Sequence, residues 1–204
     1  MGSIASSLAT NANIESGSCK SLVVRRAALE LFVTRGFQSV SLRQLADAVG
    51  IQAGSLYNHI ESKQTLLFDF IEELDSLLLH AVSKSRRGRS CVRESLCSFI
   101  KTYMQLALEN RDLYVLSRRE VCNLSADQQS DISRIRTKVL ESLADIVSLG
   151  CRKGVFDCND ANMTATTIIA TLDGALSLPW SSVVSSNDLT VQVQGFIIQA
   201  ITKK

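Results

Sequence analysis

The chain has 204 residues, of which 46% are hydrophobic and 21% charged, and this balance excludes a wholly disordered protein. A single proline and ten glycines are few for a sheet protein with many turns, so the composition favours an all-helical fold. The net charge is only +2, but residues 20–63 hold six Lys or Arg and three Asp or Glu, against 16 and 17 in the rest of the chain. The basic excess therefore lies near the N-terminus, where a nucleic-acid site is expected.

Helical periodicity predicts about nine helices and no strand. Residues 1–19 are rich in Ser, Ala and Asn and lack periodicity, so we expect a disordered N-terminal arm there. A first helix over residues 20–35 carries Val24, Ala28 and Phe32 on one face and ends at Gly36. The pattern then predicts helices over residues 41–49, 52–59, 62–86, 90–109, 112–121, 125–154, 159–178 and 189–202.

The spacing of residues 41–60 is that of a helix-turn-helix. Leu45 and Ala46 face inward on the first short helix, and Leu56 does so on the second. Gly50 lies between them, where a tight turn requires a positive φ. The front of the second helix is small and polar, which suits insertion into the major groove of DNA.

The run from Gly50 to Leu66, read with Ala28-x-x-x-Phe32 and Gly36-Phe37, resembles the signature of TetR-family transcriptional regulators. The resemblance covers about residues 22–67. It implies a helix-turn-helix DNA-binding domain over residues 20–66 and an effector-binding and dimerisation domain over residues 67–204. It further implies a homodimeric repressor in the bacterial cytoplasm, associated with the nucleoid, that a small effector releases from its operator. Such a protein is not an enzyme.

Carried over residue by residue, the resemblance implies phosphate contacts for Ser41, Tyr57, His59 and Lys63. The residues expected to contact DNA are Ser41, Arg43, Gln52, Ala53, Gly54, Ser55, Tyr57, Asn58, His59 and Lys63. Gln52 stands where the family often has Ser or Thr, and its longer amide either reads adenine, contacts a phosphate or makes no contact. As alternatives, Tyr57 packs on the long helix, and His59 and Lys63 are ordinary surface residues.

The C-terminal half resembles TetR-family regulators of fatty-acid, steroid and other acyl-CoA metabolism. Two segments carry this looser likeness, residues 111–120 (RDLYVLSRRE) and residues 173–180 (DGALSLPW). The effector would then be an acyl-CoA or a related lipid in an apolar pocket. Candidate lining residues, for each of which core packing is the alternative, are Phe99, Tyr103, Leu106, Leu116, Met163, Thr167, Thr171 and Trp180.

The last two predicted helices are unusually apolar, and an isolated monomer would expose much of that surface. We therefore expect a symmetric four-helix dimer interface. Its candidate residues are Ile168, Ile169, Leu172, Leu176, Val193, Phe196, Ile197 and Ala200.

Other classes of function have less support. No apolar run approaches the ~20 residues that span a bilayer, and no secretory signal opens the chain, so a cytoplasmic location is expected. The six cysteines form no C-x-x-C pair and there are only two histidines, so we expect neither a metal nor another cofactor. An enzyme would need a phosphate loop or a nucleophile motif that the sequence lacks. A redox-sensing DNA-binding regulator, using Cys91 with Cys97 or Cys151 with Cys158, stays open as the alternative.

Overall fold

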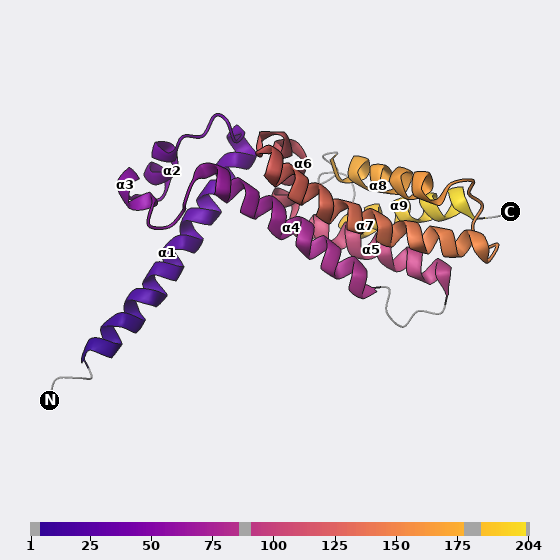
Figure 1. Cartoon of the computed structure of the whole chain (residues 1–204), viewed down its shortest axis with the longest axis horizontal. Coiled ribbons are helices and arrows are strands. Elements are labelled where there is room, and N and C mark those ends of the chain that lie inside the picture. The colour runs from indigo at the N-terminus through magenta and orange to yellow at the C-terminus, as the bar shows by residue number, and fades with distance from the viewer. Residues whose placement is uncertain (1–4, 86–90, 178–184, 203–204) are drawn as a thin grey trace. The chain divides into compact units, whose positions relative to one another are not determined.

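The computed structural model describes residues 5–85, 91–177 and 185–202, which form nine α-helices and one 3-10 turn (Figure 1). The helices are α1 (Ala5–Arg35), α2 (Leu42–Ala48), α3 (Ala53–Leu56), α4 (Lys63–Ser85), α5 (Val92–Glu109), α6 (Arg111–Glu120), α7 (Ala126–Arg152), α8 (Ala161–Ser177) and α9 (Ser186–Ile201), and the 3-10 turn η1 is Val121–Asn123. Within these ranges the only β pairing is an antiparallel bridge between Phe156 and Thr202. The predicted all-helical fold is confirmed. Among the described helices, none combines the length and the apolarity needed to cross a membrane.

The chain divides into two compact units. Unit 1 comprises Met1–Ile71 and Val115–Ser125, and unit 2 comprises Glu72–Tyr114 and Ala126–Lys204. The sequence predicts a single boundary between residues 66 and 67, whereas a segment from the middle of the chain belongs with the N-terminal unit. That segment contains the second half of α6 and all of η1.

Unit 1 is organised around a small apolar core. Phe32 on α1 is fully buried and meets the rings of Phe37 and Phe70 edge-on, with centroids 5.2 and 6.4 Å away. Leu45 of α2 and Leu56 of α3 are also fully buried. Helices as short as α2 and α3 are not stable alone, so this burial holds them in place.

The N-terminal arm is one point where structure and sequence prediction differ. A disordered arm is predicted over residues 1–19, but α1 begins at Ala5 and runs without interruption to Arg35. The only proline of the chain is Pro179, so no residue of this stretch forbids a helix, and Ala, Ser and Leu tolerate it. The helix ends where predicted, at Gly36, whose φ is +83°.

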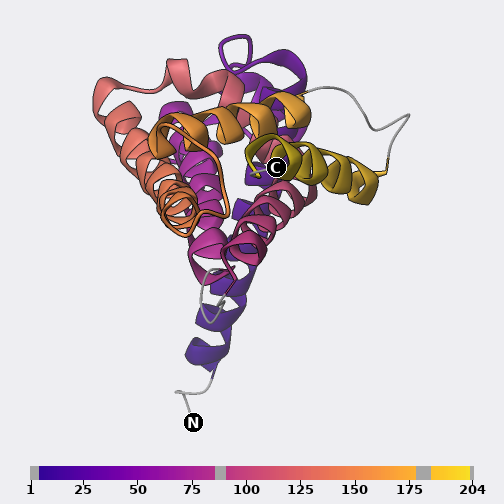
Figure 2. The same ribbon diagram turned by 90° about the vertical axis from the view of Figure 1, so that its right-hand side faces the viewer.

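Unit 2 is a helical bundle in which α5 packs against α7, α8 and α9. Helices α8 and α9 also pack on each other, and Figure 2 shows them side by side. Its core includes the stacked rings of Phe99 and Tyr103, with centroids 6.3 Å apart. A partly buried ion pair joins the unit 2 part of α4 to α7, because Arg136 Nε lies 2.7 Å from Oδ2 of Asp75, a residue that is only 2% exposed.

Candidate nucleic-acid interface

Helix α2 begins with a complete capping box. The Ser41 hydroxyl accepts a hydrogen bond from the Gln44 amide at 3.2 Å, and the Gln44 side chain accepts one from the Ser41 amide at 2.8 Å. Gln44 is a structural residue that our sequence reading missed, although the S-x-x-Q spacing is a known signal for this cap. The Ser41 hydroxyl is therefore engaged as the cap of α2.

Helix α3 presents a small polar front. Its N-cap, Gln52, makes no capping hydrogen bond with its side chain. Gln52, Ala53, Gly54 and Asn58 are exposed, Tyr57 is 61% exposed, and Ser55 is half-buried. The helix proper is Ala53–Leu56, shorter than the predicted 52–59, since the chain after it continues as turns. The structure therefore brings the predicted base-reading residues together on one surface.

Two of the residues predicted to contact DNA, Arg43 and His59, have different surroundings. Arg43 is exposed and lines an open hollow of about 660 Å³ between α2 and α3, which Gln52 and Ala53 also line. His59 is half-buried and instead lines a hollow of about 290 Å³ with Arg25 of α1 and Asp69 of α4. Arg43 thus lies beside the recognition surface, and His59 lies toward the first helix.

Lys63 is engaged inside unit 1. Its ammonium donates to the carbonyl oxygens of Phe37 at 2.9 Å and Val40 at 2.8 Å, and lies 4.2 Å from the centre of the Phe37 ring. Partial burial lowers the pKa of the Lys63 ammonium from its ordinary value, because desolvation disfavours the charged form. The ammonium of Lys63 is therefore bonded to the backbone of unit 1 and is not an ordinary solvated surface group.

The segment Val115–Ser125 adds polar groups to unit 1 that sequence reasoning missed. The Glu120 carboxylate, 6% exposed, accepts hydrogen bonds from the Phe37 amide at 3.4 Å, Arg119 Nε at 2.9 Å and Asn123 Nδ2 at 2.7 Å. Arg119 Nη2 donates to the carbonyl oxygens of Phe32 and Val33 at the end of α1. The contacts of Glu120 with Phe37 and of Arg119 with Phe32 and Val33 join residues more than 80 positions apart in the chain, so no local pattern could reveal them.

In unit 2, the candidate effector residues fall into separate places. Phe99 and Tyr103 are buried in the core and Leu106 packs against it, while Leu116 is buried but belongs to unit 1. Met163, Thr167 and Thr171 line a groove of about 300 Å³ between α8 and α9. Trp180 lies outside the described residues. Asp173 of α8 is a polar group bonded to two core residues, because its Oδ1 accepts hydrogen bonds from the hydroxyls of Tyr103, at 2.8 Å, and Tyr114.

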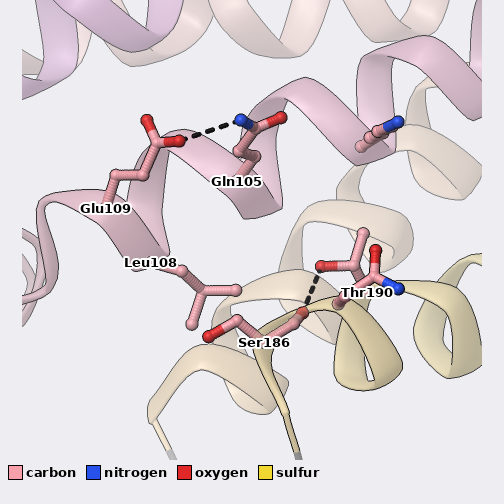
Figure 3. Close-up of a pocket in the computed structure, with 7 residues that line it drawn as sticks. Gln105, Leu108, Glu109, Ser186 and Thr190 are labelled. Atoms are coloured by element: carbon pink, nitrogen blue, oxygen red, sulfur yellow. Dashed lines mark hydrogen bonds between the residues drawn. The ribbon is translucent and has the colours of Figure 1, made fainter.

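A second hollow, of about 440 Å³, lies between α5 and the start of α9 (Figure 3). Its lining residues are Lys101, Gln105, Leu108, Glu109, Ser186, Asn187 and Thr190. Gln105 donates to Glu109 at 2.8 Å, and the Thr190 hydroxyl donates to the Ser186 carbonyl at 2.8 Å. The lining offers an ammonium, amides and hydroxyls, and so suits a polar rather than an apolar ligand.

The predicted dimer residues divide between core and surface. Ile168, Leu172, Leu176 and Ile197 are buried in unit 2, and Ile169 and Val193 are partly buried against the same core. Phe196 is 65% exposed and Ala200 is exposed on the outer side of α9. Met163, also 65% exposed, lies on α8 and lines the same groove as Phe196. An apolar surface therefore remains on α8 and α9 in the single chain.

The fold and the α2–α3 surface define a helix-turn-helix DNA-binding protein with a separate helical bundle. Comparison with known families gives the same class. The model "Bacterial regulatory proteins, tetR family" matches residues 24–70, and "Tetracyclin repressor-like, C-terminal domain" matches residues 90–176. The chain belongs to the TetR family, whose members are DNA-binding transcriptional regulators and not enzymes.

The individual relatives have low sequence identity to this chain. The HTH-type transcriptional repressor KstR2 of Rhodococcus jostii is 25% identical over 134 residues, a match that covers 63% of this chain and 64% of that repressor. The ketosteroid regulator KstR2 of Mycobacterium tuberculosis superposes with a TM-score of 0.83 at 19% identity, covering 90% of this chain and 95% of that one. The structure of AibR in complex with isovaleryl coenzyme A and operator DNA superposes with a TM-score of 0.76 at 17% identity, and the match covers 87% of this chain and 97% of AibR. Identities this low establish the fold alone.

Proposed function

We propose that the protein is a transcriptional repressor of the cytoplasm that binds operator DNA through α2 and α3. The observation that carries this proposal is the exposed front of α3, where Gln52 and Asn58 offer amide groups and the small Gly54 adds no bulk that would keep them from base edges. Affinity would come chiefly from phosphates. If a dimer neutralises on the order of 6–10 phosphates, binding falls by about 10³–10⁵ between 50 and 200 mM salt.

The test is a gel shift with the DNA upstream of the protein's own coding region. Wild type should bind, and Gln52→Ala should lose about 1–3 kcal/mol per half-site if its amide reads a base. Gln105→Ala makes the same chemical change on α5 in unit 2 and should bind as wild type does. Equal binding by all three proteins would remove Gln52 from the interface, and no binding by wild type to this or to random genomic fragments would refute the proposal.

The second part of the proposal is a homodimer formed through α8 and α9. Support comes from the exposed Phe196, Met163 and Ala200 on these two helices. Two recognition helices about 34–36 Å apart, or a multiple of that, would meet successive major grooves. Sedimentation should give a dimer for wild type and a monomer for Phe196→Glu. Leu77→Glu, a matched change at a side chain 42% exposed on α4, should stay dimeric, and a monomeric wild type would refute this part.

The third part is an acyl-CoA or related lipid as the effector. The isovaleryl coenzyme A bound to AibR and the ketosteroid role of KstR2 support this class. In this chain the Asp173 carboxylate with Tyr103 and Tyr114 is a polar anchor beside an apolar core, the kind of lining expected for a long apolar ligand with one polar group.

A thermal-shift series would test the effector class. Acyl-CoAs of increasing chain length should raise the melting temperature, whereas coenzyme A alone should not. Tyr103→Phe removes one hydroxyl from the anchor and should weaken the response. If no acyl-CoA or steroid ester stabilises the protein, the effector class is wrong while the DNA-binding proposal stands.

The alternative, a redox-sensing regulator, would use the pair Cys151 and Cys158. Cys151 and Cys158 are joined by a disulfide with Cα atoms 6.4 Å apart, whereas Cys91 and Cys97 are free thiols. A hydroperoxide would oxidise the two thiols to this disulfide while being reduced to an alcohol and water. Operator binding that changes on peroxide treatment, returns with dithiothreitol and is insensitive to both in Cys151→Ser would support it. Binding that ignores the redox state would exclude it.

A further inference from the structure

The turn between α1 and α2 decides where the DNA-binding helices begin. Residues 36–40 form it, and Ser41, the N-cap of α2, follows at once. Within the turn, the Gly36 amide donates to the Phe32 carbonyl at 3.0 Å, and the Val40 amide donates to the Phe37 carbonyl at 3.3 Å. These two bonds leave other polar groups of the turn for side chains from elsewhere in unit 1.

One such side chain is Lys63. Its ammonium has three donors, and two of them are bonded to the carbonyl oxygens of Phe37 and Val40. The Phe37 ring covers the same ammonium at 4.2 Å, a cation–π contact that adds to the hold on the turn. Lys63 is the first residue of α4, so it joins the turn to the helix that follows α3.

The other is Glu120. Its Oε1 accepts from the Phe37 amide, and its two oxygens also accept from Arg119 and Asn123. Asn123 in turn accepts a hydrogen bond from the side chain of Gln38, at 2.7 Å. The carboxylate is buried and is bonded to charged and amide donors. A buried charge held in this way is costly to disturb.

We propose that Lys63 and Glu120 are positioning residues for DNA binding, which hold the α1–α2 turn through its carbonyls and its amide and so fix the start of α2. Lys63 then acts through the turn and not as a phosphate ligand. This inference rests on the proposed DNA-binding function. It also gives residues 115–123 a role within unit 1, through Arg119, Glu120 and Asn123.

The charge of Glu120 makes the inference testable by the sign of an effect. Glu120→Gln removes a negative charge from a DNA-binding unit, so electrostatics alone predicts equal or tighter binding. A positioning role predicts weaker binding, by tenfold or more, because the new amide N–H₂ meets the donor of Asn123. Glu61→Gln removes the same charge at an exposed position of unit 1 and should bind at least as well as wild type.

Lys63 is tested by salt dependence. Lys63→Met keeps an unbranched chain beside the Phe37 ring but removes the ammonium. If Lys63 contacted a phosphate, a dimer would lose two contacts and the slope of log K against log salt would become shallower by about 1.8. A positioning role predicts weaker binding with an unchanged slope. Arg43→Met, beside the recognition surface, is the control in which a shallower slope is expected.

A measurement without DNA separates failure of this inference from failure of the proposed function. Hydrogen–deuterium exchange at residues 37–41 should be faster in Glu120→Gln and in the milder Asn123→Ala, and unchanged in Glu61→Gln. Circular dichroism should confirm that each variant is folded, and if Glu120→Gln is not, Asn123→Ala decides in both assays. If wild type binds no DNA, the function fails and exchange alone judges the turn contacts. Unchanged exchange, unweakened binding by the deciding variant, or a shallower slope in Lys63→Met would each overturn the inference.

Discussion

Gly150, near the end of α7, has no room for a side chain. A Cβ built on it would lie 2.0 Å from Cδ2 and 2.4 Å from Cε2 of Phe156, far inside van der Waals contact. Phe156 is 3% exposed and belongs to the core of unit 2, and the amides of Val155 and Phe156 both donate to the Gly150 carbonyl. Neither the ring nor its backbone can therefore move away at low cost. We predict that Gly150→Ala is destabilising although alanine is the better helix former.

The magnitude follows from two opposing terms. Overpacking a core costs about 1–3 kcal/mol, and more when a large ring must leave it, while replacing Gly by Ala inside a helix gains about 1 kcal/mol. Because the Cβ would approach the Phe156 ring to 2.0 Å, we take the upper end of the overpacking cost, and the resulting net loss of about 2 kcal/mol lowers the melting temperature by about 4–8 °C in a chain of this size. Calorimetry at fixed redox state would measure the shift, since the disulfide of Cys151 is adjacent to the site.

The reasoning is sharpest in a double-mutant cycle. Phe156→Ala removes the ring. In that background Gly150→Ala should cause no overpacking, so only the higher helix propensity of alanine remains and the free energy of unfolding should rise by about 1 kcal/mol. The sign of the alanine effect thus reverses between the two backgrounds. The same sign in both, or no change in either, would show that the contact between Gly150 and Phe156 does not govern this end of α7.

Three further outcomes are expected. Arg136→Met removes the guanidinium from the buried Asp75 carboxylate and should lower the free energy of unfolding in urea by about 2–3 kcal/mol. This is less than the full cost of breaking a buried pair, because Arg136 is 30% exposed. A decrease of under about 0.5 kcal/mol would contradict the prediction. Burial raises the pKa of the Cys97 thiol, so its thiolate fraction at pH 8 is reduced and iodoacetamide should label it more slowly than the exposed thiols, by mass spectrometry; equal rates would refute the prediction. Cys151→Ser should lower the stability of the oxidised protein by about 2–3 kcal/mol through loss of the Cys151–Cys158 loop closure and leave that of the reduced protein nearly unchanged.

Local chemistry made the candidate DNA-binding surface predictable. The turn at Gly50, with φ +69°, and the buried Leu45 and Leu56 follow from spacing alone, as do the exposed residues at the front of α3. The contacts of Lys63 do not follow from spacing, because the sequence places Lys63 at the start of a helix but does not show which backbone carbonyls its ammonium reaches. The contact of Glu120 with Phe37 is even harder to predict from the sequence, because the two residues are 83 positions apart.

Helical periodicity also has a limit in the apolar C-terminal helices. Ile168 and Leu172 face the core, whereas Met163 and Phe196 face outward, yet all four are apolar positions on helices with two apolar sides. A period of 3.6 identifies such faces but does not say which one meets the core of its own chain. The same ambiguity affects Met163 and Thr167, which are candidates for lining an effector pocket and which line the groove between α8 and α9.

The contacts of the basic side chains change what the charge near the N-terminus means. Of the six Lys or Arg in residues 20–63, Lys63 is bonded to backbone carbonyls, and Arg25 lies 3.5 Å from Asp69 and 4.8 Å from the Phe70 ring centre. The other four basic side chains are exposed, namely Lys20, Arg26, Arg35 and Arg43. Four per chain, or eight in a dimer, bound the salt slope from these residues at about −7. A measured slope near −11, as all six would give with twelve phosphates per dimer, would mean that Lys63 and Arg25 leave their partners in unit 1 when DNA binds.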